Sequence, residues 1–502
     1  MFEQIISVFF GMFALHKLLL LLTGVMMGLI IGLIPGLTGL FGLTIMLPLT
    51  ILMDLSDAVI IMMAMLSVSM TGDSIPAILL SIPGTPTSVA TIMDGHPLAK
   101  KGQGARALGA AYTSSAIGGV FGAVILMSLI PVIRPIILLF GAPEILMLAV
   151  WGLTMVSTLT GGAPFRGLAA AGLGILLASI GRAPATGELR YTMGLVYLWD
   201  GIPFAPAVLG LFAFPEIFSL ALTKLQISEL AMPKFKELWN GEIRGAKDSL
   251  RNLFLVLRCS AIGSLVGIIP GLGGTVASWF AYGHAKQTCK NTETFGTGDI
   301  RGVIAPECAN NAIEGGALLP TLAFGIPGSA GMAVLLGAFI NVGVQPGPVV
   351  ITERLDLVYT LMWALALSNI IGTGICFILG GQLARLVSLP YYLLVSVLVP
   401  LVFLAAYTTT ITFWDMVACL GFGLLGYLMR EFKWPRPPLL IGFVLAPYIE
   451  WNLNISVLLM EWRWLFRPAV LVIFAFTVAS IIYPLAKEVS QRKNRYEQEI
   501  PK

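Results

Sequence analysis

The chain alternates between long apolar runs and short polar stretches along most of its length. An α-helix needs about 20 consecutive apolar residues to cross the roughly 30 Å hydrocarbon core of a membrane. The apolar runs have about this length, and roughly 12 of them fit between the polar stretches. The pattern therefore predicts an all-α polytopic membrane protein with roughly 12 transmembrane segments.

The tripeptide Ile-Pro-Gly interrupts the apolar runs at residues 34–36, 82–84, 269–271 and 326–328. The surrounding sequences match in two pairs: residues 32–40 align with 267–275, and residues 72–84 align with 316–328. Because both signatures occur twice in the same order, the chain is predicted to be a duplication of two related halves.

Residues 1–223 form the first predicted membrane repeat and residues 253–486 the second. An amphipathic linker, residues 224–252, joins them, and its excess of basic residues predicts a cytoplasmic location. The polar C-terminal tail, residues 487–502, also has basic residues and is likewise predicted to be cytoplasmic. Each interrupted run can be counted as one long crossing or two short ones, so the count leaves inverted and parallel repeats open. We expect inverted repeats.

Proline lacks an N–H and clashes with the preceding turn, so each interruption opens the helix. Open backbone at membrane depth is tolerated only where protein buries it or a cavity exposes it. We predict a broken helix at Pro35 and Pro270 and a re-entrant hairpin at Pro83 and Pro327, one of each in either half. Paired interruptions in two halves indicate a transport site near the middle of the membrane. For single glycines and prolines, simple kinks or close helix packing remain an alternative.

Composition excludes a soluble protein. Apolar residues make up 57% of the chain, charged residues only 11%, and the mean hydropathy is +0.90, whereas a soluble domain has roughly 25% charged residues. The net charge of +4 is spread over loops, which favours a lipid bilayer and not nucleic acid as the partner. The five cysteines and three histidines lack metal or disulfide spacing, so we expect no metal site and no cofactor.

The four interruptions provide groups that can bind an anion. Backbone N–H groups lose their helical acceptors there, the new helix N-terminus carries a partial positive charge, and glycine lets a ligand approach closely. Such a site suits a carboxylate, while the freed carbonyls on the other side suit a sodium ion. The residues predicted to bind substrate on this basis are Gly36, Thr38, Gly39, Gly84, Thr85, Thr87, Ser88, Gly271, Gly273, Gly274, Thr275, Pro327, Gly328, Ser329 and Gly331.

The run GDIRGVIAPECANNA at residues 298–312, followed by GIPGS at 325–329, resembles the large membrane subunit, the TctA family, of the tripartite tricarboxylate transporters. Residues 32–37, 94–97 and 439–445 agree with this family. The resemblance implies a secondary transporter for small organic anions such as tri- or dicarboxylates, in the bacterial inner membrane. It also implies an ion gradient, a small four-helix membrane subunit and a periplasmic solute-binding protein. We further expect an elevator-like alternating access, in which a unit that contains both interrupted segments moves against a fixed scaffold.

The resemblance adds Asn310 and Asn311 to the predicted substrate site, since amides both donate and accept hydrogen bonds. Arg301 either pairs with Asp299 or Glu307, or contacts the anion directly. Cys308 and Glu314 stand where family members carry small residues. Asp73 is either a cation ligand or a turn residue at the membrane edge. A site built mainly from carbonyls and hydroxyls favours Na⁺ over H⁺ as the coupling ion, but the sequence leaves the ion and the anion open.

Parts of the sequence also fit two other classes of protein. Residues 296–299 spell G-x-G-D, the string of intramembrane aspartyl proteases. Their chemistry needs two facing aspartates, whereas Asp299 lies in a polar loop and Asp415 has no matching motif, so we expect no enzyme. A passive anion channel or an ion-only transporter would use the same interrupted helices and remains open.

Overall fold

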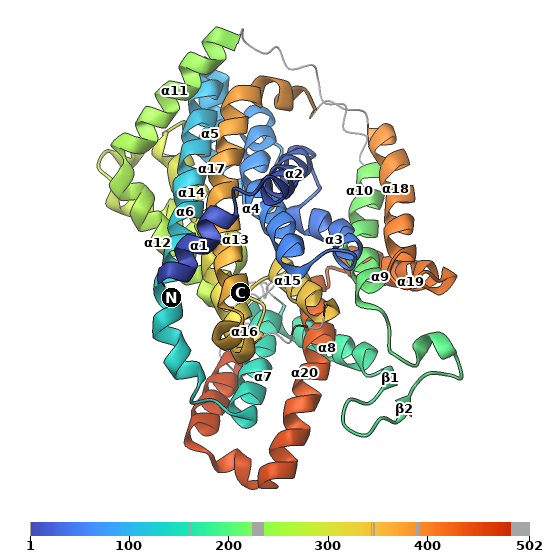
Figure 1. The fold of residues 1–502 in the computed structure, drawn as a ribbon. Coiled ribbons are helices and arrows are strands. Elements are labelled where there is room, and N and C mark those ends of the chain that lie inside the picture. The colour runs from blue at the N-terminus through green and yellow to red at the C-terminus, as the bar shows by residue number, and fades with distance from the viewer. Residues whose placement is uncertain are drawn as a thin grey trace, which may run out of the picture.

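The computed structural model describes residues 2–159, 163–222, 235–342, 344, 347–386 and 391–482, and it is almost entirely helical (Figure 1). The elements of the first half are α1 (Phe2–Gly11), α2 (Leu15–Leu33), α3 (Gly39–Thr50), α4 (Leu55–Leu80), α5 (Val89–Leu98), the π-helical turn η1 (Ala99–Gln103), α6 (Gly104–Ile137), α7 (Ala142–Leu159), α8 (Pro164–Ala178), β1 (Gly181–Arg182), β2 (Leu189–Arg190), η2 (Val196–Leu198), α9 (Phe204–Val208), η3 (Leu209–Ala213) and α10 (Phe214–Leu222). The two short strands pair antiparallel.

The second half begins after a surface helix. Its elements are α11 (Phe235–Arg251), α12 (Leu253–Ile268), α13 (Gly273–Thr288), η4 (Thr292–Thr294), α14 (Arg301–Phe324), α15 (Ala330–Asn341), α16 (Pro348–Glu353), α17 (Leu355–Leu386), α18 (Tyr391–Tyr407), α19 (Phe413–Glu431), α20 (Arg436–Met460), η5 (Arg463–Phe466) and a last helix, Pro468–Ile482. α4, α6, α14 and α17 lie at the centre, while α10, α18 and α19 lie together at one side (Figure 1).

α4 and α14 are the two central helices, and almost all of their residues are buried. Both run straight through a proline, Pro76 or Pro320, and end a few residues later on a left-handed residue, Ser81 (φ 60°) or Gly325 (φ 68°). The N–H of the following isoleucine donates to the carbonyl of that proline in each copy, a common way to close a helix C-terminus. These prolines therefore precede the interruption and do not cause it.

The interruption at Pro35 makes a helical hairpin, which differs from the predicted broken span. Gly24, Gly28 and Gly32 of α2 pack in order along α4, with an added Cβ meeting Ile61, Met65 and Ser69 respectively, so α2 and α4 run in the same direction. α3 returns, because Gly39 lies against Ser69 and Gly42 against Met65.

The second half repeats this hairpin. Gly263 and Gly267 of α12 pack on Ala309 and Ile313 of α14 in the same direction, and α13 then returns along α12. Backbone geometry explains both reversals: the isoleucine is extended, and the glycine after proline adopts φ +88° at Gly36 and +90° at Gly271, which a side chain would disfavour.

The interruptions after α4 and α14 also fold back. Gly84 donates its N–H to Asp73, eleven residues earlier, at 2.7 Å, so the tip that follows Pro83 lies beside the middle of α4. α5 then runs outward again, since His96 Nδ1 lies 3.2 Å from the carbonyl oxygen of Ile78. Gly328 likewise lies against Ala317, two to three turns before the end of α14.

α4 and α14 run in opposite directions. Gly95 lies between Ile78, near the end of α4, and Val303, at the start of α14. At mid-helix, Asn311 Nδ2 donates to the carbonyl oxygen of Ser67 at 3.3 Å. The α2–α3 hairpin packs along α4, and the α12–α13 hairpin packs along α14. Because α4 and α14 run in opposite directions, the two hairpin tips approach from opposite ends of the bundle.

Within the described residues, seven helices are long and apolar enough to cross a membrane, or eight if the α11–α12 pair, bent by 76°, counts as one span. The structure therefore supports a polytopic all-helical membrane protein, while the count of roughly 12 segments stays a prediction. Six further apolar helices are shorter, 10–17 residues, because turns and interruptions divide runs that looked continuous in the sequence. Of the predicted linker and tail, residues 224–234 and 487–502 lie outside the described residues.

Candidate substrate cavity

All four Ile-Pro-Gly interruptions meet around one cavity of about 280 Å³. The two hairpin tips (residues 34–39 and 269–274) contribute to its wall. So do the two fold-back segments (residues 81–88 and 325–329) and the middle of α4 and α14. The lining residues are Thr38, Gly39, Leu40, Leu66, Met70, Thr85, Pro86, Thr87, Gly267, Gly273, Gly274, Ile313, Glu314, Ala317, Gly328, Ser329, Ala330 and Gly331.

Three helices begin at this cavity: α3, α13 and α15. Thr38 and Ser329 cap α3 and α15, accepting hydrogen bonds from the N–H groups of Phe41 at 3.3 Å and Met332 at 3.2 Å. Each helix N-terminus carries about half a positive charge on its unsatisfied N–H groups. The wall thus presents three positive helix ends without a basic side chain, and these ends can accept an anion.

Glycine at the tips serves close packing as well as backbone exposure. A Cβ on Gly274 would lie 2.7 Å from Cγ2 of Thr87 and 3.1 Å from Oδ1 of Asn310. A Cβ on Gly328 would lie 3.1 Å from the Ala317 side chain. The packing alternative weighed from the sequence therefore holds at these positions too, since hairpin tip and fold-back segment touch there.

Asp73 fastens the fold-back segment of the first half. Its buried carboxylate accepts the N–H groups of Gly84 at 2.7 Å and Thr85 at 3.0 Å, a short hydrogen bond from the Thr85 hydroxyl, and the Ser88 hydroxyl at 3.2 Å. These donors, predicted to face substrate, face Asp73 instead. Asp73 is also fully buried, and so it is not a turn residue at an exposed edge.

The cavity gathers about half of the predicted site residues. Those that line it are Thr38, Gly39, Thr85, Thr87, Gly273, Gly274, Gly328, Ser329 and Gly331. Those that do not are Gly36, Gly84, Ser88, Gly271, Thr275, Asn310, Asn311 and Pro327. Gly36 and Gly271 occupy the reversal itself, behind the first residues of the returning helix.

Asn310 and Asn311 point to opposite sides of α14. Asn310 lies beside Gly274 at the cavity, and its Oδ1 is buried without a hydrogen-bond partner. Asn311 bonds to Thr71 of α4 at 3.1 Å and Asn369 of α17 at 2.7 Å, so it joins helices and does not line the cavity. Neighbours on a helix cannot both face one ligand.

Among the lining positions that sequence reasoning missed are Leu66 and Met70 on α4 and Glu314 on α14. Leu66 and Met70 on α4 align with Asn310 and Glu314 on α14. Extending the alignment of residues 72–84 with 316–328 by six residues toward the N-terminus would have found these positions, because i, i+4 and i+7 share one face of a helix.

The polar loop before α14 is held in place by an ion pair and hydrogen bonds. Arg301 pairs with Asp299 at 2.6 Å, not with Glu307, and also donates to the carbonyl of Asn291 at 2.9 Å. Burial alone would raise the pKa of Asp299, but hydrogen bonds from Arg301 and Thr294 hold it below its ordinary value. Glu307 instead accepts the hydroxyls of Thr91 and Ser115 at 2.6 and 3.1 Å.

Asp94 anchors this loop from the first half, accepting N–H groups of Gly296, Gly298 and Asp299, each at 2.8 Å. Asp415 is held elsewhere, by Tyr197 at 2.9 Å and Thr410 at 2.7 Å. The two aspartates of the G-x-G-D hypothesis are therefore both committed to local structure, and no aspartyl-protease geometry is formed by this pair.

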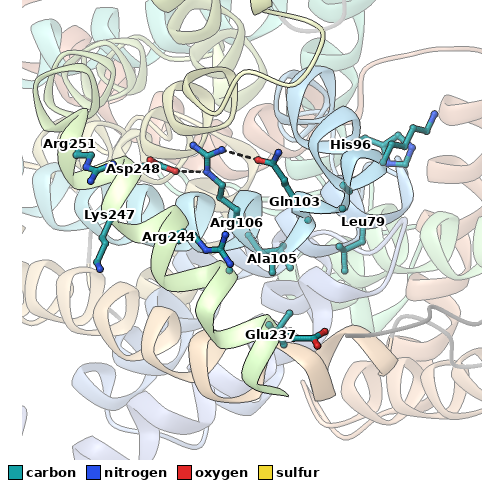
Figure 2. Close-up of a pocket in the computed structure, with 17 residues that line it drawn as sticks. Leu79, His96, Gln103, Ala105, Arg106, Glu237, Arg244, Lys247, Asp248 and Arg251 are labelled. Atoms are coloured by element: carbon teal, nitrogen blue, oxygen red, sulfur yellow. Dashed lines mark hydrogen bonds and ion pairs between the residues drawn. The ribbon is translucent and has the colours of Figure 1, made fainter. Parts of the chain in front are cut away.

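A larger cavity of about 1190 Å³ lies between α11 and the α5–α6 junction (Figure 2). α11 supplies Arg244, Lys247 and Arg251, and Arg106 of α6 pairs there with Asp248 at 2.6 Å. None of the four interruptions lines it. We therefore place the candidate substrate site at the smaller cavity, where helix N-termini converge.

A helical membrane protein whose interrupted helices direct their N-termini at an internal cavity has the architecture of a secondary transporter. The chain belongs to the tripartite tricarboxylate transporter TctA family, which it matches over residues 18–441. This is a transporter family and not an enzyme family.

Two relatives come from Agrobacterium vitis. An uncharacterized 52.8 kDa protein in the TAR-I ttuC' 3' region is 30% identical over 475 residues, which cover 94% of both chains. An uncharacterized protein in the TAR-II ttuC' 3' region is 35% identical over 192 residues, 38% of this chain and 79% of that protein. No solved structure matches the chain.

Proposed function

We propose that this protein is the permease subunit for uptake of small organic anions, tri- or dicarboxylates, across the bacterial inner membrane. A periplasmic solute-binding protein delivers the anion, a small four-helix membrane subunit accompanies the permease, and an ion gradient drives uptake. The observation that carries the proposal is the cavity into which α3, α13 and α15 direct their N-termini.

The size of the cavity supports a small substrate. Pockets for drug-sized ligands have volumes of roughly 300–1,000 Å³, and this one has about 280 Å³. Several helix N-termini around one small space suit a compact molecule with more than one carboxylate, because each carboxylate can meet its own N-terminus.

The arrangement of the two halves supports alternating access. α4 and α14 run in opposite directions, and hairpins of matching sequence reach the cavity from opposite ends, as expected for inverted repeats. In an elevator-like cycle both hairpins, α4 and α14 would move as one unit with the anion. α10, α18 and α19, which lie together at one side (Figure 1), would belong to the fixed scaffold. Na⁺ is favoured as the coupling ion, because helix interruptions free backbone carbonyls.

Reconstitution tests the proposal. The chain and the small subunit are inserted in liposomes, the binding protein is added outside, and uptake of radiolabelled citrate and succinate is followed with and without a Na⁺ gradient. Accumulation above the external concentration that requires the gradient and the binding protein supports the proposal. Equilibration without a gradient would indicate a passive channel, and ion flux without any carboxylate would indicate an ion-only transporter.

A further inference from the structure

Glu314 places a carboxyl group in the wall of the anion cavity. The residue is 5% exposed, its Oε2 has no hydrogen-bond partner, and it lines the cavity together with Ala317, one turn further along α14. Asn310, one turn earlier, leaves its buried Oδ1 without a partner beside Gly274. Two oxygens without a donor therefore lie on the cavity face of one helix.

The other buried carboxylates nearby are already satisfied. Asp73 on α4 accepts four hydrogen bonds from the fold-back segment, and Glu307 on α14 accepts two hydroxyls. The lining residues, all within the described part of the chain, include no Lys, Arg or His. Glu314 is thus a titratable group at the cavity that lacks both a hydrogen bond and a countercharge from the wall.

A charged Glu314 conflicts with an anionic substrate. Two like charges about 4 Å apart at an effective dielectric constant near 20 weaken binding by about 1,000-fold. A cation at Glu314 removes this penalty and adds attraction. Met70 occupies the equivalent position in the first half. Of these two equivalent positions in the cavity wall, only position 314 therefore carries a carboxyl group.

We propose that Glu314, assisted by Asn310 Oδ1, binds one monovalent cation with each substrate anion and thereby couples uptake to the gradient of that cation. The inference rests on the proposed function. The cation is either a proton on the carboxyl group or Na⁺ held between the carboxylate and the amide oxygen. Both neutralise Glu314, and both use chemistry that these oxygens supply.

The test compares wild type with Glu314→Gln, which keeps the shape and removes the charge. The ratio of cation to citrate is measured in proteoliposomes from the membrane potential at which net flux stops, once with a Na⁺ gradient at fixed pH and once with a pH gradient without Na⁺. The variant is expected to carry one cation fewer for each citrate, and the gradient that loses its effect identifies the cation. An unchanged ratio would overturn the inference.

Two further variants keep the test decisive. Glu353→Gln makes the same change at an exposed residue that does not line the cavity, and it is expected to keep the wild-type ratio. If Glu314→Gln inserts but does not transport, citrate binding to purified protein is measured against cation concentration. Citrate binding that no longer depends on the cation concentration supports the inference, and wild-type dependence overturns it. If that variant fails to insert, Glu314→Asp is measured in the same way, with a shifted cation affinity as the supporting result and an unshifted one as the contrary result. Absence of citrate uptake by wild type would instead contradict the proposed function.

Discussion

The N–H of Gly271 donates to the carbonyl oxygen of Gly328 at 3.3 Å. Each residue is the glycine of an Ile-Pro-Gly interruption, so this bond ties the hairpin tip of the second half to its fold-back segment. Because buried backbone groups need partners, the two interruptions satisfy each other and hold one side of the cavity in place.

Gly328→Val is expected to abolish uptake without preventing insertion. A Cβ at this position would lie 3.2 Å from the carbonyl oxygen of Gly267 and 3.1 Å from Ala317, so the branched side chain forces the tip and α14 apart. Citrate uptake should fall about 100-fold or more, since small displacements in a site have effects of this size. Gly374→Val, where an added Cβ meets nothing within 4 Å, is the control, and unaltered uptake by Gly328→Val would refute the site assignment.

Asp73→Asn is expected to loosen the fold-back segment of the first half. The amide keeps one acceptor oxygen but loses the charge and the second acceptor for Gly84, Thr85 and Ser88. Hydrogen bonds to a charged group contribute about 2 kcal/mol each, so both the melting temperature in detergent and citrate uptake should drop. Ser74→Ala, which removes only a hydroxyl bonded within α4, should change either quantity little; equal effects of the two variants would contradict the role of Asp73.

The Asp299–Arg301 pair predicts acid sensitivity of the loop before α14. The pKa of Asp299 is lowered in the folded protein, so the pair stabilises the fold above the ordinary aspartate pKa of about 3.9, and this stabilisation is lost as pH falls through the folded value. Wild type should therefore lose thermal stability below about pH 4.

Asp299→Asn is the matched test of that loop, measured as melting temperature between pH 3 and 7. The variant should be less stable at neutral pH, by about 1–2 kcal/mol, and should lose less on acidification. Parallel pH profiles for variant and wild type would show that other carboxyl groups govern the acid loss.

A disulfide between moving unit and scaffold is expected to stop transport. α3 and α18 are in contact, and Ile45 of α3 and Val402 of α18 belong to the same packed cluster. An Ile45→Cys, Val402→Cys pair is therefore a candidate for joining the two units, once its oxidation to a disulfide is verified by mass spectrometry. Oxidation should abolish citrate uptake and reduction should restore it. The control, Ala281→Cys with native Cys259, joins helices of one hairpin, where Cys259 Sγ already lies 3.8 Å from the Ala281 carbonyl oxygen. Full turnover by the oxidised first pair would exclude an elevator-like movement of α3 against α18.

Much of this architecture could be predicted from local sequence signals. The duplicated Ile-Pro-Gly signatures marked the four segments that meet at the cavity, because proline and glycine restrict backbone geometry wherever they occur. They could not show the direction of the chain after each interruption. Pro35 reverses the chain into a hairpin, whereas Pro76 lies within an intact helix, so a proline alone does not specify which outcome follows.

The side-chain partners were less accessible to sequence reasoning. Asp73 was singled out, but its bonds to residues 84–88 depend on a fold-back that the sequence does not specify. Asn310 and Asn311 are adjacent in the sequence, yet only helix rotation relative to α4 and α17 determines which one lies beside the cavity-lining Gly274. Apolar runs do not reveal where short helices end, so the sequence alone could not fix the number of crossings.

Asn311 has a mechanical consequence for the whole cycle. Its amide nitrogen bonds to Ser67 and Thr71 of α4 and to Asn369 of α17, deep in a low-dielectric interior where replacing such bonds is costly. Sliding α4 past α14 would leave these groups without hydrogen-bond partners, so the contact between the two helices resists such a movement. In the proposed cycle α4 and α14 would therefore move as one rigid body, and the solute would reach the other compartment when that body shifts against the surrounding helices.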